Sequence, residues 1–240
     1  MMIRIVNLSK AFGKQQVLSN INLAFDRGQS VALIGPNGSG KTTLIKALLG
    51  LVVAKGEIFV GDHSVKGQSV YRRHIGYMPQ MSRFPENMTV KQLFTMMKDI
   101  RRDVKPSAYD MDMYEAFEID NMASKRLGIL SGGMKQKVSA ALAFLFDPPI
   151  LILDEPTAGL DPISNELLKG KLKKEIARGK LVLITSHILN DLDEITTHVT
   201  YLMDGEVKFF KSLDQLKNET AENRLNRIIA QILNQEDVYV

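Results

Sequence analysis

The alternation of apolar and polar residues changes along the chain, and it predicts strands of two kinds. Over residues 3–8 and 21–25 apolar positions alternate with polar ones, which is typical of antiparallel strands joined by turns. The runs 31–34, 150–153 and 181–184 are short and continuously apolar, as in strands buried on both faces of a sheet. Because helical spacing separates these buried strands, we expect a parallel sheet covered by helices.

Helical spacing replaces the strand pattern in the middle of the chain. The first clear stripe consists of Val90, Leu93, Phe94 and Met97. We therefore expect a helical segment over residues 81–146, inserted between parts of the sheet. Asp204 and Gly205 lie between apolar runs and predict a hairpin turn, and the residues after Ser212 again have amphipathic helical spacing.

These patterns predict an α/β fold with a parallel sheet core, an N-terminal antiparallel β subdomain and an inserted α-helical subdomain. We expect a single domain over residues 1–240. Within it, residues 1–80 and 147–211 form the core with the β subdomain, residues 81–146 form the helical subdomain, and residues 212–240 form a helical tail.

The composition is that of an ordinary globular chain, with 45% hydrophobic and 24% charged residues. There is no Cys, which excludes disulfides and thiolate metal sites. The basic residues between Lys169 and Lys174 are interspersed with apolar residues at helical spacing, so we expect a solvated helix face there, and no nucleic acid as a partner.

The sequence shows no segment for crossing a bilayer. The first residues lack the apolar core of a signal peptide. The longest apolar run, over residues 138–146, is interrupted by Ser139 and is far shorter than the roughly 20 residues that a spanning helix needs. We therefore expect any membrane work to come from a partner.

A phosphate-binding loop follows the buried strand 31–34. It consists of Gly35, Pro36, Asn37, Gly38, Ser39, Gly40, Lys41, Thr42 and Thr43. The glycines let the backbone wrap closely around phosphate oxygens, and the start of the following helix adds partial positive charge. Lys41 is expected to reach the β- and γ-phosphates, while the Thr42 hydroxyl is expected to be a magnesium ligand.

Two acidic residues stand at the end of the buried strand 150–153. Asp154 directly follows four apolar residues, where a carboxylate is costly unless it is paired or lies near a metal ion. We expect Asp154 to hold magnesium and Glu155 to orient or deprotonate the attacking water. Next to a phosphate loop, an ordinary surface turn before Pro156 is the weaker interpretation.

A second anion-binding arrangement lies between these two motifs. Ser131, Gly132 and Gly133 begin a predicted helix, so they offer a hydroxyl and backbone amides to an anion. Taken alone, the segment is compatible with simple helix capping. Two phosphate-facing segments and one nucleotide loop nevertheless indicate a site shared between two copies of the chain.

In their order, these motifs resemble those of the ATP-binding cassette (ABC) ATPases, from Ile3 to about Phe210. Residues 35–43 resemble the Walker A loop, residues 151–155 the Walker B strand, and residues 130–137 the signature motif, hereafter the signature segment. Four further positions resemble family motifs: Phe12 the aromatic that stacks on adenine, Gln80 the Q-loop glutamine, Asp161 the D-loop aspartate and His187 the switch histidine. The chain departs from the family at Met134, where Gln is common.

The resemblance implies a RecA-like P-loop NTPase fold with ATP and Mg²⁺ as cofactors. It implies that two subunits close head to tail over two ATP molecules, so that Walker A of one and the signature segment of the other hold each nucleotide. On this basis Glu155, His187, Gln80 and Asp161 are the expected catalytic residues. Gln80 is also an expected magnesium ligand, and it would pass movement to a membrane partner.

The expected partners are an integral membrane permease and a second copy or a homologous ATPase, at the cytoplasmic face of the bacterial inner membrane. The alternative is a soluble ABC ATPase in assembly or repair. Residues 77–90 also resemble the ATPase subunit of the transporter that matures nitrous oxide reductase, a copper enzyme, which would add a periplasmic accessory protein. A generic exporter ATPase is the other interpretation of that stretch.

Overall fold

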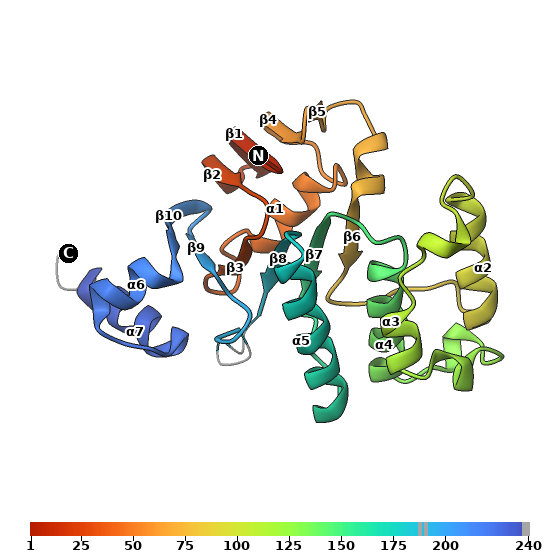
Figure 1. Cartoon of the computed structure of the whole chain (residues 1–240). Helices are drawn as coiled ribbons and strands as arrows, with labels where there is room; N and C mark the ends of the chain where they lie inside the picture. Colours follow the sequence, from red (N-terminus) through yellow and green to blue (C-terminus); the bar gives the residue numbers. More distant parts are fainter. Residues whose placement is uncertain (187–188, 190–191, 237–240) are drawn as a thin grey trace. The chain divides into compact units, whose positions relative to one another are not determined.

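The chain forms two compact units in the computed structural model (Figure 1), which describes every residue except 187–188, 190–191 and 237–240. The first unit contains residues 1–71 and 181–240, and the second contains residues 72–180. The subdivision expected from the sequence, with boundaries after residues 80 and 146, stays a prediction.

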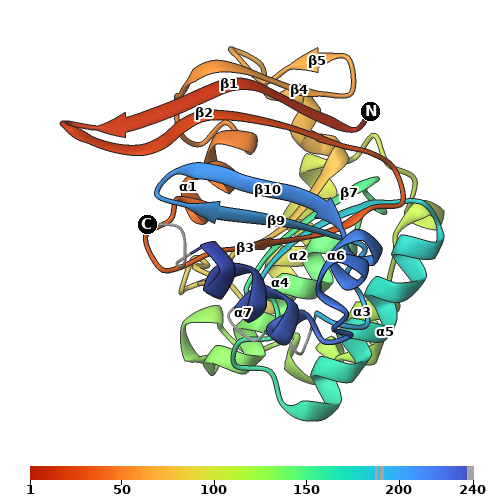
Figure 2. The same ribbon diagram turned by 90° about the vertical axis from the view of Figure 1, so that its left-hand side faces the viewer.

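An antiparallel sheet forms the N-terminal part of the first unit. It contains β1 (Ile3–Phe12), β2 (Gln15–Phe25), β4 (Lys55–Val60) and β5 (His63–Ser64), in the order β2-β1-β4-β5. The long hairpin of β1 and β2 is clear in Figure 2, and Phe12 pairs with Gln15 at its tip. Ile3, Ile5 and Leu8 are buried, as the alternation predicted.

The second sheet of this unit carries the phosphate loop. Its strands are β3 (Ser30–Ile34), β8 (Leu181–Thr185), β9 (His198–Met203) and β10 (Glu206–Ser212). β3 runs parallel to both β8 and β9, and β10 returns antiparallel to β9 after the predicted turn at Asp204 and Gly205. All residues of β3 and β8 are buried, as their continuous apolar runs predicted.

Three helices complete the first unit. α1 (Lys41–Leu48) follows the phosphate loop, and α6 (Leu213–Thr220) and α7 (Leu225–Glu236) form the predicted helical tail. The backbone N–H of Leu225 donates to the Asp193 carboxylate at 2.7 Å, and Leu225 and Ile228 are fully buried. The tail is therefore packed through its apolar side.

The second unit combines two parallel strands with four α-helices. The strands are β6 (Ile75–Met78) and β7 (Ile150–Asp154), which pair from Ile75 opposite Ile150 to Met78 opposite Leu153. The helices are α2 (Val90–Ile100), α3 (Asp112–Ala116), α4 (Gly132–Phe144) and α5 (Pro162–Ala177). Short 3₁₀ turns lie at Val70–His74, Pro106–Ala108, Ile119–Met122 and Leu127–Ile129.

α2 shows why the sequence pattern gave reliable helices. Thr89 and Gln92 form a reciprocal capping box that satisfies two backbone N–H groups at its start. The predicted stripe of Val90, Leu93 and Phe94 is buried, so packing and capping agree on the same helix. Among the described residues, no helix combines the length and the apolar character needed to traverse a membrane.

Candidate nucleotide-binding and hydrolysis site

The phosphate loop joins β3 to α1 through a backbone that only glycine adopts easily. Gly38 and Gly40 have φ values of 83° and 106°, in the left-handed region. At Gly40 a Cβ atom would also come within 2.7 Å of the Val17 carbonyl oxygen. A side chain at Gly40 would therefore push the loop away from β2.

Lys41 and the start of α1 concentrate positive charge at this loop. The Lys41 Nζ atom donates to the carbonyl oxygens of Gly35 at 2.7 Å and Pro36 at 3.0 Å, which holds it over the loop. No side chain caps the N-terminus of α1, so its N–H groups and dipole remain directed at the loop. Thr42 is exposed at the same helix start.

A buried hydroxyl adds a further donor to the loop. The Ser39 side chain is 3% exposed, and its Oγ has no hydrogen-bond partner among the described residues. A buried hydroxyl is rarely left unsatisfied, so this atom is suited to an acceptor that a phosphate group would supply. The loop therefore fits a nucleotide triphosphate in both charge and hydrogen bonding.

Two neighbouring elements hold the loop in place. The Gly205 N–H, in the β9–β10 turn, donates to the Ser39 carbonyl at 3.2 Å, and the Ser19 N–H of β2 donates to the Gly205 carbonyl at 2.8 Å. β2 therefore lies beside the loop, a few residues from the hairpin tip that carries Phe12. Phe12 is 51% exposed, which suits a stacking role, and Lys10 Nζ lies over one face of the ring, 4.7 Å from its centre.

The acidic pair at the end of β7 is buried, and the backbone of Glu155 is strained. Asp154 and Glu155 are 4% and 7% exposed. Glu155 has φ of 53°, an uncommon value for this residue type that costs on the order of 1–3 kcal/mol. Its carbonyl accepts from the Ala158 N–H at 3.2 Å, which closes a turn directly after the strand. Such strain at a buried carboxylate is typical of functional sites.

Tyr77, which the sequence reasoning did not single out, lies in the field of Asp154. Burial, and then the negative charge of Asp154, raise the pKa of Tyr77 to about 12. Tyr77 lies in β6, and Gln80 lies in the segment that follows it. Met78 of β6 pairs with Leu153 of β7. Gln80 and Asp154 therefore follow the carboxyl ends of neighbouring parallel strands, and Gln80 is exposed. Only the long-range pairing of β6 with β7 reveals this neighbourhood.

The signature segment begins α4 and is open at its first turn. Ser131 is the N-cap, and its Oγ accepts from the Met134 N–H at 3.3 Å. Ser131 and Gly132 are exposed, and the first turn contains no acidic residue that would compete with an anion. A Cβ atom at Gly133 would lie 2.6 Å from the Gly159 carbonyl oxygen, so the two backbones meet directly.

Asp161 caps α5 and pairs with α4. Its carboxylate accepts from the Ser164 N–H at 2.9 Å and from the Ser164 hydroxyl at 2.7 Å. The Lys137 Nζ atom lies 2.9 Å from Oδ2, the same oxygen that accepts from the Ser164 hydroxyl. Hydrogen bonds from Lys137 and then from Ser164 hold the pKa of Asp161 well below its usual range, so the carboxylate is charged at neutral pH.

The predicted site residues thus fall into two sets. The phosphate loop from Gly35 to Thr43 and Phe12 belong to the first unit. Gln80, Ser131 to Gly133, Asp154, Glu155 and Asp161 belong to the second. His187 lies outside the described residues. The roles given to all of these residues stay predictions.

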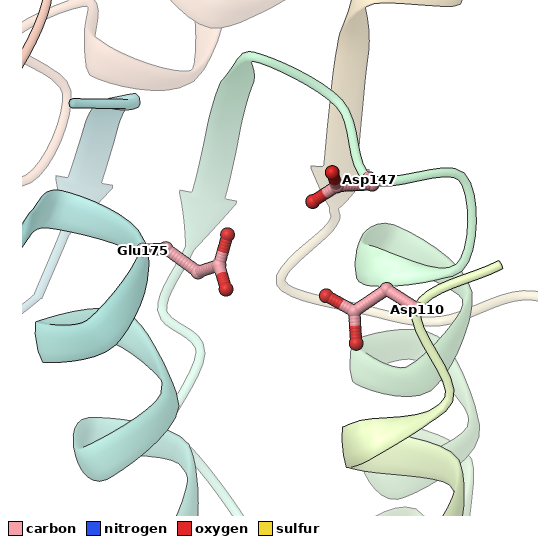
Figure 3. Close-up of side chains that lie close together, drawn as sticks. All are labelled: Asp110, Asp147 and Glu175. Atoms are coloured by element: carbon pink, nitrogen blue, oxygen red, sulfur yellow. The ribbon is translucent and has the colours of Figure 1, made fainter. Parts of the chain in front are cut away.

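A separate group of carboxylates in the second unit was not expected from the sequence. Asp110, Asp147 and Glu175 project from three different segments toward one another, with oxygen atoms all within 4.8 Å (Figure 3). Lys171 Nζ lies 2.6 Å from Asp110 and 3.0 Å from Glu175, and Lys180 contacts both Asp147 and Glu175. Arg178 also pairs with Asp147 and Glu175, and Lys171 also pairs with Asp112, so three cationic side chains face these carboxylates.

Lys171 is an exception to the predicted solvated basic helix face, on which Lys173 and Lys174 are exposed. Lys171 is 6% exposed, so it is buried among carboxylates and not solvated. Burial lowers the pKa of Lys171, but hydrogen bonds to Asp110, Asp112 and Glu175 outweigh it and raise the pKa above its ordinary value. Helical spacing located the helix correctly, but it could not show which lysine met acidic residues from other segments.

The comparisons with known proteins agree with this geometry. Residues 18–158 match the family model described as ABC transporter. The chain is 32% identical over 213 residues to a Nod factor export ATP-binding protein I of Bradyrhizobium sp. (strain SNU001), covering 85% of this chain and 68% of that protein. It is 33% identical over 223 residues to the ABC transporter ATP-binding protein YtrB of Bacillus subtilis (strain 168), covering 91% and 74%.

Solved structures show the same fold. The ATP-binding subunit of an ABC transporter superposes with a TM-score of 0.89 at 29% identity, covering 97% of this chain and 100% of that one. A dimeric ATP-binding cassette in a post-hydrolysis state, bound to ADP and Pi, superposes with a TM-score of 0.75 at 27% identity, covering 88% and 99%.

The fold and the phosphate loop define a P-loop nucleotide triphosphatase, which confirms the predicted fold class. The chain belongs to the ABC transporter family, as an ATP-binding and ATP-hydrolysing subunit.

Proposed function

We propose that this chain powers a membrane permease by ATP-driven association of two cassettes. The observation that carries the proposal is the pair of phosphate-facing helix starts: α1, which no side chain caps, and α4, whose exposed first turn has no acidic residue. One nucleotide on the phosphate loop leaves the signature segment available for the nucleotide of a second copy. ATP then joins the two copies, and its cleavage removes the bridging γ-phosphate and separates them.

The residues divide the reaction among them. The loop amides, Lys41 and the start of α1 hold the triphosphate. Ser131, Gly132 and Gly133 of the partner cassette would contact its γ-phosphate. The oxygen of a water molecule attacks the γ-phosphorus while Glu155 accepts a proton from that water. The bond between the γ-phosphorus and the bridging oxygen of the β-phosphate breaks. His187 contacts the γ-phosphate, and Asp161 couples the two sites.

The residues present fit a magnesium ion. The proposed ligands are the Thr42 hydroxyl, the Gln80 amide and the Asp154 carboxylate, which are oxygen donors of the kind that Mg²⁺ prefers. The buried position of Asp154 after an apolar strand also fits a carboxylate that faces a cation. When bound, the ion would neutralise charge on the β- and γ-phosphates.

A groove in the second unit supports a permease as partner. It has a volume of about 590 Å³ and an apolar floor formed in part by Phe84, Met97, Ile100 and Phe146. Four arginines line it, and none of its lining residues is acidic; they are Arg72, Arg73, Arg83 and Arg101. Asp103, outside this lining, pairs with Arg73 and Arg101, and the lining itself remains basic. Its charge and apolar residues fit a short cytoplasmic helix of a permease that carries apolar anchors and an acidic residue.

The decisive experiment uses Glu155→Gln. The variant keeps the shape of the side chain but loses the base, so we expect ATP binding to persist and turnover to fall about a hundredfold or more. We also expect ATP to shift the variant from monomer to dimer in light scattering, because cleavage no longer separates the cassettes. Glu166→Gln, at an exposed carboxylate on α5, is the matched control. An unchanged ATPase rate in Glu155→Gln would refute the role of Glu155.

The location proposed is the cytoplasmic face of the bacterial inner membrane, with the permease as anchor. The alternative of a soluble ABC ATPase in assembly or repair predicts a chain that does not copurify with an integral membrane protein. Purification of the tagged chain from detergent-solubilised cells, followed by identification of the bound proteins, separates the two.

The cargo is a finer question. Assembly of the copper centres of nitrous oxide reductase, with a periplasmic accessory protein, rests on the resemblance of residues 77–90 alone, and the relatives described above do not support it. A deletion strain that makes nitrous oxide reductase with its full copper content would exclude this cargo. A generic exporter is the competing proposal, favoured by the relatives named for Nod factor export.

A further inference from the structure

One ion pair joins the first two turns of α4 to residues 158–161, hereafter the D-loop. Lys137 lies less than two turns beyond Ser131, and its Nζ atom is 2.9 Å from the Asp161 carboxylate. The Lys137 and Asp161 side chains are 24% and 49% exposed, so solvent screens the pair in part. The geometry therefore matters more here than a contribution to stability.

Asp161 is also held by Ser164, whose hydroxyl shares the Oδ2 atom with Lys137. Both of its carboxylate oxygens accept hydrogen bonds from Ser164, one from the backbone N–H and one from the hydroxyl. These bonds fix Asp161 as the N-cap of α5. Lys137 therefore pairs with a carboxylate that Ser164 already holds in place. Through this ion pair, the position of α4 constrains the position of the D-loop.

A backbone contact lies one turn earlier on the same helix. A Cβ atom at Gly133 would come within 2.6 Å of the Gly159 carbonyl oxygen, so no side chain fits between the signature segment and the D-loop. Gly159 has φ of 77°, which turns the loop at this contact. The signature segment and the D-loop therefore meet at two points, at Gly133 and at Lys137.

The rotation of α4 is fixed by a third contact. Gln136 is 5% exposed, and its side-chain oxygen accepts from the Ser82 hydroxyl at 2.9 Å. Ser82 stands two residues after Gln80 in the chain. The ammonium of Lys137 also lies 5.8 Å from the centre of the Phe117 ring. The direction in which Lys137 leaves the helix is thereby set by its neighbours.

We propose that Lys137 is a positioning residue for ATP hydrolysis. It touches no substrate and acts through Asp161. By pairing with Asp161, Lys137 keeps the distance between the signature segment and the D-loop constant. The signature segment would contact the γ-phosphate bound to the partner, and the D-loop would couple the two sites. The inference rests on the proposed function, in which both segments face the second cassette.

The test compares steady-state ATP hydrolysis by four forms of the full chain. Lys137→Met removes the ammonium and keeps the apolar stem, and we expect kcat to fall about tenfold with KM changed less than about twofold. Lys137→Arg should recover most of kcat, since a guanidinium also pairs with a carboxylate. Lys211→Met removes an exposed pair with Glu219 at 2.7 Å in the first unit, and it should hydrolyse ATP like the wild type.

The outcomes distinguish this inference from the function on which it rests. Wild-type kcat in Lys137→Met, or a Lys137→Arg variant as slow as Lys137→Met, overturns the role of Lys137. Circular dichroism checks that each variant is folded. If Lys137→Met is unfolded, Lys137→Gln replaces it, and a kcat in Lys137→Gln equal to that of Lys137→Arg or of the wild type overturns the role of Lys137. If the wild type does not hydrolyse ATP, or Glu155→Gln does not dimerise with ATP, the proposed function itself fails.

Discussion

At the residue scale, the site combines backbone positions that are unusual for their residue types with buried charge. Gly40 supplies a left-handed backbone beside the Val17 carbonyl, where any side chain would collide. Glu155 is a buried acid whose φ also lies in the left-handed region. Backbone strain therefore falls on the residue proposed to orient water. Lys41 meets the carbonyl oxygens of Gly35 and Pro36, which an incoming phosphate can replace as its partners.

Lys41→Ala tests the phosphate loop. Its ammonium forms charge-assisted hydrogen bonds with phosphate oxygens, which are worth about 1.5–3 kcal/mol each. We expect the affinity for ATP to fall by about tenfold to a hundredfold, measured by isothermal titration calorimetry with Mg²⁺ present. Lys46→Ala, at an exposed lysine in the last turn of α1, should bind ATP like the wild type. Unaltered affinity in Lys41→Ala would remove Lys41 from the site.

At the scale of elements, two helix starts are proposed to bind phosphate and one groove is proposed to bind the permease. α1 begins without a side-chain cap, whereas α4 begins with Ser131 accepting from the Met134 N–H. At α4 the Ser131 Oγ accepts from the Met134 N–H and keeps its hydroxyl hydrogen to donate to a γ-phosphate oxygen when a second cassette arrives. The arginine-lined groove lies in the second unit, where α2 contributes Leu93, Met97 and Ile100 to its lining.

Ile100→Glu tests the groove as the docking surface. Ile100 is 64% exposed, so the substitution leaves the folded chain intact, but it places a carboxylate where we propose that an acidic, apolar helix binds. We expect the fraction of chain that sediments with native membranes to fall several-fold, while the ATPase rate of the isolated chain is unchanged. The matched control is Leu167→Glu, at an exposed apolar residue on α5. Equal sedimentation of the two variants would argue against docking in this groove.

At the scale of the whole molecule, the carboxylate cluster ties distant segments of the second unit together. Asp110 precedes α3, Asp147 follows α4, and Glu175 belongs to α5 (Figure 3). Burial raises the pKa of Glu175, but Lys180 and Lys171 outweigh it and lower the pKa below 4.5, while the pKa of Asp147 is likewise lowered, chiefly by Lys180. These carboxylates therefore stabilise the fold above their unfolded-state pKa values, and that contribution is lost as the pH falls through the folded-state values.

Glu175→Gln tests this cluster by its pH dependence. At pH 7 we expect the free energy of unfolding to fall by about 2 kcal/mol, the typical loss for a hydrogen bond to a charged group. Between pH 7 and about pH 2 the variant should lose less stability than the wild type, because it no longer has this carboxylate, whose pKa is lowered in the folded state, to protonate. Urea unfolding at both pH values measures the difference. Equal pH dependence in the two proteins would show that Glu175 does not act in this way.

Local patterns in the sequence determined the strands, most helices and the phosphate loop, because each depends on residues close together in the chain. The glycines of residues 35–40, the apolar runs of β3, β7 and β8, and the capped stripe of α2 are all of this kind. The same patterns placed Asp154 and Glu155 at a strand end, but not the strained backbone of Glu155.

Only the tertiary structure decided which charged groups meet. Lys171 and Asp110 are 61 residues apart in sequence, so no periodicity could have shown that this lysine is buried against that carboxylate. The same holds for Lys137 with Asp161. The influence of Asp154 on the neutral Tyr77 likewise depends on the pairing of β6 with β7. Such pairs form because packing brings separate segments together and because buried charge requires a partner, and both conditions are set by the fold as a whole.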